Sequence, residues 1–265
     1  MVRSIPLQID MLTVISPAKT LDFETPPQTA KTSTPIFRPQ TKELAGIMRG
    51  KSPKDLSKLM GISPKLAELN AERFEQFKTR GNPGKQALLA FKGDVYVGLN
   101  VESYDERDFT FAQNNLRILS GLYGVLRPLD VIQPYRLEMG TKLTTAAGKT
   151  LYDYWNNAIG KAIAEELSDH RNKTLVNLAS NEYFKAVAVS MLPGKLITPV
   201  FKDYSKGTYK ILSFFAKKAR GAMSTFIVKN RITKPDDLKT FSEDGYAFNT
   251  TYSTDTEWVF TRKGN

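Results

Sequence analysis

Short, nearly continuous apolar runs punctuate the chain, and such runs are typical of buried strands. Leu12–Ile15 and Leu175–Ala179 predict two strands of a central sheet. Lys195–Tyr204 and Thr208–Phe214 predict two more, separated by a Ser-Lys-Gly turn. Glu257–Thr261 predicts an edge strand that closes the chain.

Between these runs, apolar positions recur at helical spacing. Trp155, Ile159 and Ile163, for example, fall on one amphipathic stripe. The pattern predicts helices over Pro39–Arg49, Pro53–Met60, Pro64–Lys78, Asp108–Leu119, Tyr152–Leu167, Glu182–Leu192, Phe215–Asn230 and Pro235–Phe241. Because strands and helices interleave, we expect a mixed α/β fold, in which helices flank a mixed central sheet.

The length of 265 residues suffices for one compact domain. Met11 is a second candidate start, so we expect residues 1–10 to be an N-terminal extension and residues 11–265 to form a single domain. Thr25–Pro39, rich in proline and threonine, predicts a surface excursion after the first strand.

Composition excludes several classes of site. The chain has no cysteine, which excludes disulfides and cysteine-ligated metals and fits a reducing, cytoplasmic compartment. The one histidine, His170, follows a predicted helix, where a cation is favourable, so a His-based triad or metal site is not expected. No apolar stretch approaches the roughly 18 residues of a membrane helix. We therefore expect no metal, no cofactor and no membrane contact, and a monomer.

Positive charge is segregated along the sequence. The net charge is +11, and Lys195–Lys234 holds ten basic residues against one acid. Lys31–Lys92 holds thirteen against five, whereas Gly93–Asp130 has six acids and three bases. A solvated surface that merely keeps the protein soluble is one interpretation. The sharper one is a face that binds a polyanion, of which nucleic acid is the usual kind.

A turn between two predicted helices carries its own signal. Gly61 can adopt the left-handed conformation that ends the first helix, Ile62 can pack between the helices, and Ser63 can cap the second. With Lys65 following, residues 52–78 resemble a helix-hairpin-helix element, in which free amides and a helix dipole attract a phosphate without reading the bases. Ser63 stands where that motif has its second glycine. The alternative is an ordinary, well-capped helical hairpin.

From the hairpin and the second basic block we predict a set of residues that contact the DNA backbone. They are Lys54, Gly61, Ile62, Ser63, Lys65, Lys202, Lys206, Lys210, Lys217, Lys218 and Arg220.

Several segments together resemble the YaaA family, in the right order from Met11 to about Phe248. They are Ile15–Leu21, Tyr96–Leu99, Leu119–Asp130, Pro134–Gly140, Leu151–Tyr152, Asn177–Tyr183 and Lys217–Gly221. The resemblance implies a bacterial cytoplasmic protein that resists peroxide and limits free intracellular iron. It also implies a compact α/β fold with a basic cleft, a helix-hairpin-helix element and affinity for DNA.

The same segments support a rival hypothesis, because they place polar groups at or near predicted strand ends. These groups are Ser16, Lys19, Arg136, Glu138, Asn177, Ser180, Glu182 and Tyr183. Ligands bind at strand carboxyl ends in open α/β sheets, so this polar cluster could hold a phosphate or carboxylate, line a DNA cleft, or be purely structural.

The sequence has no phosphate-binding loop of the Walker type, and it offers no histidine or cysteine that we expect to act as a catalyst. We therefore expect a sequence-nonspecific DNA-binding protein of the peroxide response, with no catalytic cycle of its own. The alternative is an enzyme that acts on a nucleotide or small anion at the polar cluster.

Overall fold

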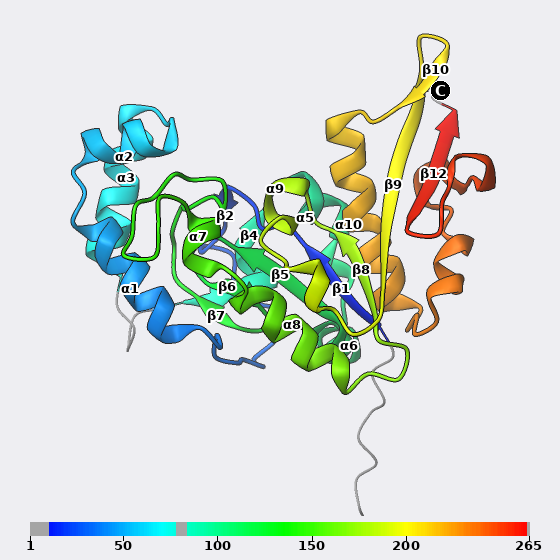
Figure 1. Ribbon diagram of the computed structural model, residues 1–265, viewed down its shortest axis with the longest axis horizontal. Coiled ribbons are helices and arrows are strands. Elements are labelled where there is room, and N and C mark those ends of the chain that lie inside the picture. The colour runs from blue at the N-terminus through cyan, green and yellow to red at the C-terminus, as the bar shows by residue number, and fades with distance from the viewer. Residues whose placement is uncertain (1–10, 78–83, 264–265) are drawn as a thin grey trace, which may run out of the picture.

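A computed structural model describes residues 11–77 and 84–263, and Figure 1 shows their arrangement. The extension that we expect at residues 1–10 lies outside the described residues. A central strand, β1 (Met11–Ile15), is buried along its whole length because all its residues except Thr13 are apolar and both sheet faces are covered. Within the described residues, no helix is long and apolar enough to cross a membrane.

The main sheet is mixed, as the sequence predicts. Its order is β11-β12-β9-β8-β1-β5-β6, with β10 paired to β9. β1, β5, β8, β9 and β12 run parallel, whereas β6, β10 and β11 are antiparallel to their neighbours. Besides β1, the strands are β5 (Leu116–Ser120), β6 (Gly124–Leu126), β8 (Thr174–Leu178), β9 (Lys195–Ser205), β10 (Thr208–Lys210), β11 (Ala247–Phe248) and β12 (Glu257–Lys263).

The parallel strands define an edge where ligands bind in such folds. The chain forms β5 on one side of β1, then crosses to β8 and β9 on the other. The order therefore reverses between β1 and β8, and the crevice outside strand carboxyl ends at such a switch point is the usual ligand position.

Helices lie at both ends of the long axis of the molecule. In Figure 1, α1–α3 lie at one end, and α10 stands beside β9 at the other. The α-helices are α1 (Arg38–Arg49), α2 (Pro53–Met60), α3 (Pro64–Glu75), α4 (Ala87–Ala90), α5 (Asp94–Leu99), α6 (Glu106–Asn115), α7 (Leu151–Trp155), α8 (Ala158–Ser168), α9 (Asn181–Phe184) and α10 (Ser213–Lys229). Short two-stranded pairs join β2 (Thr20–Leu21) to β4 (Phe91–Lys92) and β3 (Lys85–Gln86) to β7 (Val131–Ile132).

Three predicted helices are wrong in extent. The helix predicted over Asp108–Leu119 stops at Asn115, and β5 follows, because its residues pair with β1. The helix over Tyr152–Leu167 is broken at Asn156, whose φ of 41° is not helical. The helix over Glu182–Leu192 is reduced to α9 and a short 3₁₀ turn at Val189–Met191.

The C-terminal elements also differ in detail. Pro235–Thr240 is a 3₁₀ helix, and the strand predicted over Thr208–Phe214 stops at Lys210 because α10 begins at Ser213. β12 is not an edge strand, because β11 pairs with its outer side. In the N-terminal half of the chain, α3 ends at Glu75 rather than at residue 78.

One strand extends well beyond the central sheet. Only Lys195–Ile197 of the 11-residue β9 pair with β8. Thr198–Ser205 continue beyond this pairing for roughly 26 Å at 3.3 Å per residue, paired with β12 and, at the tip, with β10. We call the structure formed by Thr198–Lys210 and β12 the β9 arm; it projects from the body in Figure 1.

Candidate functional site

The turn between α2 and α3 forms as its residues predict. Ser52 caps α2 in a reciprocal capping box with Asp55. Gly61 ends that helix with φ 61° and ψ 40°, a left-handed conformation that glycine adopts without strain. The Ser63 hydroxyl accepts a hydrogen bond from the Leu66 amide at 3.4 Å and so caps α3. The local chemistry of caps therefore decides the shape of this hairpin.

The tip of the turn is open to solvent on one side and anchored on the other. Ile62 is 8% exposed and packs into the core, while the Ser57 hydroxyl donates a hydrogen bond to its carbonyl at 2.7 Å. Ser63 and Lys65 are exposed. Among the described residues, nothing accepts a hydrogen bond from the Ser63 or Lys65 amide. The exposed turn thus carries two amide donors without a partner among the described residues and one lysine.

Beside this turn lies an open groove of about 700 Å³, which we call the hairpin groove. One wall comes from α2 and the other from the loop 140–144. Lys51, Lys58 and Lys142 line it, with Asp55 as the acid among its lining residues. The groove is therefore positive overall, and sequence reasoning missed its second wall.

The polar cluster assembles at the switch point between β1 and β8. The Ser180 amide donates to the Ser16 hydroxyl at 2.8 Å, and the two hydroxyl oxygens are 3.2 Å apart. Asn177 accepts a hydrogen bond from the Ala179 amide at 3.0 Å, which shapes the same bend. The Tyr96 hydroxyl donates to the Ser16 carbonyl at 3.1 Å. The ends of the two strands are thus fixed to each other by side chains.

Charged groups of the cluster come from a loop that crosses the end of β5. A Cβ at Gly121 would lie 2.4 Å from the Leu137 carbonyl oxygen, so this loop runs directly over the strand end. Glu138 pairs with Lys19 at 2.8 Å and with Arg136 at 2.9 Å. The Arg136 Nε is buried and has no hydrogen-bond partner among the described residues. Two cations share one carboxylate, which leaves the trio net positive.

Glu182 connects the cluster to the hairpin groove. Its carboxylate accepts a hydrogen bond at 2.9 Å from the amide of Gly140, which itself lines the groove. Neighbouring Tyr183 is buried, and this burial raises the pKa of its phenol, which therefore stays neutral. Burial, followed by the charge of Arg136, lowers the pKa of Arg73 on α3. Arg73 of α3 thus lies within electrostatic range of Arg136 in the cluster.

The second basic block occupies the other end of the molecule. Lys202, Lys206 and Lys210 belong to the β9 arm, whereas Lys217 and Lys218 lie on α10. Lys217 pairs with Asp94 at 3.5 Å, and Lys218 pairs with Asp244 at 3.0 Å. Arg220 is largely enclosed, and that burial lowers its pKa. In Figure 1 the α2–α3 hairpin and the β9 arm stand at opposite ends of the long axis and rise toward the same side.

Comparison with known proteins decides the family. The family model described as peroxide stress protein YaaA matches residues 11–252. The chain belongs to this YaaA family. UPF0246 proteins of Teredinibacter turnerae and Saccharophagus degradans are 52% and 53% identical to it over 256 residues, which is 96% of this chain and 100% of each relative. A UPF0246 protein of Acaryochloris marina is 54% identical over 254 residues, 95% of this chain and 100% of the relative.

Several of the YaaA segments named in the sequence meet at the polar cluster, whereas Lys217–Gly221 lies on α10. The predicted residues of the polar cluster meet at the carboxyl edge, although Ser16 and Ser180 are 164 positions apart. The predicted DNA contacts, in contrast, fall into two separate groups. His170, which we expected as a cation at a helix end, follows α8 but is only 4% exposed. Arg73 and Lys142 were missed, because only tertiary packing brings them to the cluster and the groove.

Proposed function

We propose that this chain binds DNA through phosphate contacts, without sequence preference, as part of the peroxide stress response. The observation that carries the proposal is the α2–α3 turn, where Ser63 and Lys65 are exposed and their amides donate no hydrogen bond to any of the described residues. Amides at a helix N-terminus bind phosphate oxygens and ignore base identity. In the peroxide response, such occupancy would shield the bound DNA from iron-driven oxidation.

The hairpin groove and the β9 arm extend this contact. Lys51, Lys58 and Lys142 lie beside the turn, and the arm carries Lys202 and Lys206 at the far end of the same side. A duplex that reaches from one end toward the other would meet basic groups at both. We propose that a monomer suffices for this contact, because one chain supplies both groups.

A fluorescence-anisotropy titration of a labelled duplex tests the proposal. If about five phosphates are neutralised, log K falls with log salt at a slope of about −4 to −5. Lys65→Glu is expected to weaken binding about 5- to 30-fold and to reduce the slope by about one unit. Melting temperature should hardly move, because the Lys65 side chain is on the surface.

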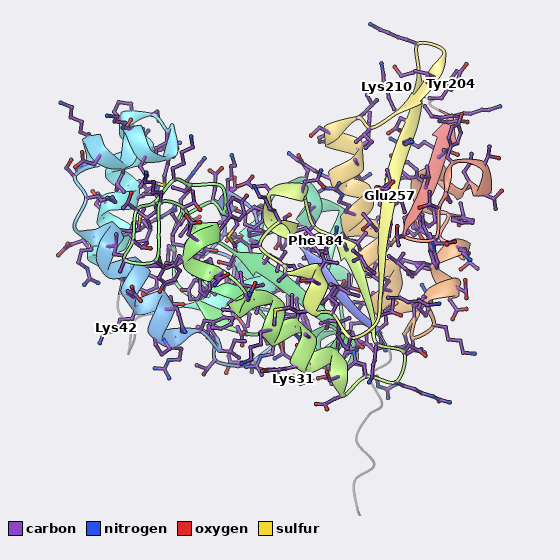
Figure 2. The ribbon with its side chains drawn as sticks, in the orientation of Figure 1. Lys31, Lys42, Phe184, Tyr204, Lys210 and Glu257 are labelled. Carbon is purple, nitrogen blue, oxygen red and sulfur yellow. The ribbon has the colours of Figure 1, made fainter. Side chains whose placement is uncertain are left out.

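Lys42→Glu is the matched control, since it makes the same charge change on the neighbouring helix α1. Figure 2 shows Lys42 on the side of the molecule away from the α2–α3 turn. Equal weakening by both variants would mean that a diffuse positive field, not the turn, attracts DNA. Absence of duplex binding by the wild type at low salt would refute the proposal altogether.

A second candidate function is the binding of a small anion, such as a nucleotide phosphate, at the polar cluster. The observation that favours it is the buried, unpartnered Nε of Arg136 beside the switch point. Calorimetric titration with phosphate and nucleoside monophosphates would show binding that Arg136→Ala and Lys19→Ala abolish. If both variants retain the affinity of the wild type, the cluster serves the fold alone.

A further inference from the structure

The tip of the β9 arm and the neighbouring 3₁₀ turn Thr250–Tyr252 expose aromatic rings outside the core. Tyr204 is 47% exposed and Tyr252 is 48% exposed. Tyr209 lies between them, with ring centroids 5.2 Å from Tyr204 and 5.7 Å from Tyr252. Tyr204 and Tyr209 are direct cross-strand partners, so the three rings form one continuous run, which we call the tyrosine face.

Strand alternation separates this face from the core of the arm. Phe201 and Asp203 point inward. The Phe201 ring packs on the rings of Phe241 and Phe260, with centroid separations of 5.9 and 5.5 Å. The intervening residues Lys202 and Tyr204 therefore belong to the opposite face. Among the described residues, the three tyrosines belong neither to the hydrophobic core nor to the residues packed against it, and the exposure of Tyr204 and Tyr252 leaves apolar ring surface in water.

The β9–β10 side of the tyrosine face is basic, although the exposed acids Asp255 and Glu257 follow Tyr252 in the sequence. Between residues 199 and 220 the only acid is Asp203, which is 3% exposed and paired with Arg262. The Lys202 ammonium group lies 5.4 Å above the Tyr252 ring, and Lys206 is exposed in the turn beyond. Figure 2 shows Tyr204 and Lys210 at the tip of the arm, well away from the body.

Exposed rings within a positive field suit one partner best. Ammonium groups attract phosphates, and ring faces stack on bases. In a duplex the base faces are already covered by their neighbours, whereas an unpaired strand presents them.

We propose that the tyrosine face, with Lys202 and Lys206, binds unpaired DNA by stacking successive bases on Tyr204 and Tyr252. This inference rests on the proposed DNA binding and adds the form of DNA that the arm recognises. The Tyr204 and Tyr209 rings meet at 66°, and the Tyr209 and Tyr252 rings meet at 67°. The three rings therefore do not stack on one another, and about half of the surface of Tyr204 and of Tyr252 stays exposed and available to a base.

The test compares three labelled DNAs by anisotropy: oligothymidine, a strand of the same length with abasic residues, and a duplex. Tyr204→Ala and Tyr252→Ala are each expected to weaken oligothymidine binding about tenfold. Tyr204→Phe and Tyr252→Phe keep the ring and should bind within about twofold of the wild type. Binding of the abasic strand and of the duplex should not change, since neither uses the rings.

Phe214→Ala provides a control, because Phe214 is 57% exposed but lies on α10 outside the tyrosine face. An equal loss from Phe214→Ala, or an equal loss on the abasic strand, would overturn the proposal. So would wild-type affinity in both alanine variants, or tighter binding of oligouridine than of oligothymidine. A wild type that binds neither duplex nor single strand would instead refute the proposed function itself. Circular dichroism verifies that each variant keeps the fold.

Discussion

Gly221→Ala tests the packing that holds α10 in place. Gly221 meets α5 so closely that an added Cβ would lie 1.8 Å from the Val95 carbonyl oxygen and 2.6 Å from the Leu99 amide nitrogen. The obstructing atoms are backbone, which cannot rotate away as a side chain can. Overpacking costs about 1–3 kcal/mol, and this contact belongs at the upper end of that range or above it. Alanine returns about 1 kcal/mol through its helix propensity.

The net loss is therefore about 2–3 kcal/mol of unfolding free energy, which corresponds to a fall of about 4–12 °C in melting temperature for a chain of this size. Thermal unfolding followed by circular dichroism measures it. Gly46→Ala is the matched control: Gly46 lies in the exposed face of α1 and a Cβ there would meet nothing within 4 Å. That variant should gain about 0.5–1 kcal/mol. If Gly221→Ala melts at or above the wild-type temperature, the close approach of α5 and α10 is not as described.

Two further predictions concern pH. Asp108 is buried, and although desolvation raises its pKa, hydrogen bonds from Lys229 and other donors outweigh this and lower it. The ionised carboxylate of Asp108 therefore stabilises the fold fully at pH values above its unfolded pKa of about 4. This contribution to stability is lost as the pH falls through the lowered pKa of the folded state. Asp108→Asn should destabilise the protein at pH 7 and flatten its acid unfolding curve, as urea titrations would show. Burial raises the pKa of Tyr96, Tyr123 and Tyr135, so the stability that they contribute is complete below pH 10 and falls as pH rises beyond it. Melting temperatures from pH 8 to 12 should decline only above pH 10.

Local chemistry made the hairpin predictable. A helix cap involves residues within a few positions of one another, so Gly61 and Ser63 reveal their roles without tertiary information. The same holds for β1, whose apolar run can only be buried. The strand at β5 could not be recognised in this way, because its conformation comes from pairing with β1, about a hundred residues earlier.

Only part of the candidate site could be predicted from the sequence. A general rule about strand carboxyl ends correctly placed Ser16 and Ser180 near one another. No local pattern marks Lys142 as a wall of the hairpin groove or places Arg73 beside Arg136. These positions depend on how the loop 140–144 and α3 pack, which is decided by the whole fold.

The switch point has a consequence for synthesis of the chain. β1 is among the first segments to leave the ribosome, but its partner β8 begins only at Thr174. Until then, one side of β1 has no strand to pair with, and the bridge between Ser16 and Ser180 cannot form. Contacts of such long sequence separation form late and slowly. A nascent chain therefore completes its hairpin early and the carboxyl edge between β1 and β8 late, so a truncated product ending before β8 would carry the basic helices but lack that edge.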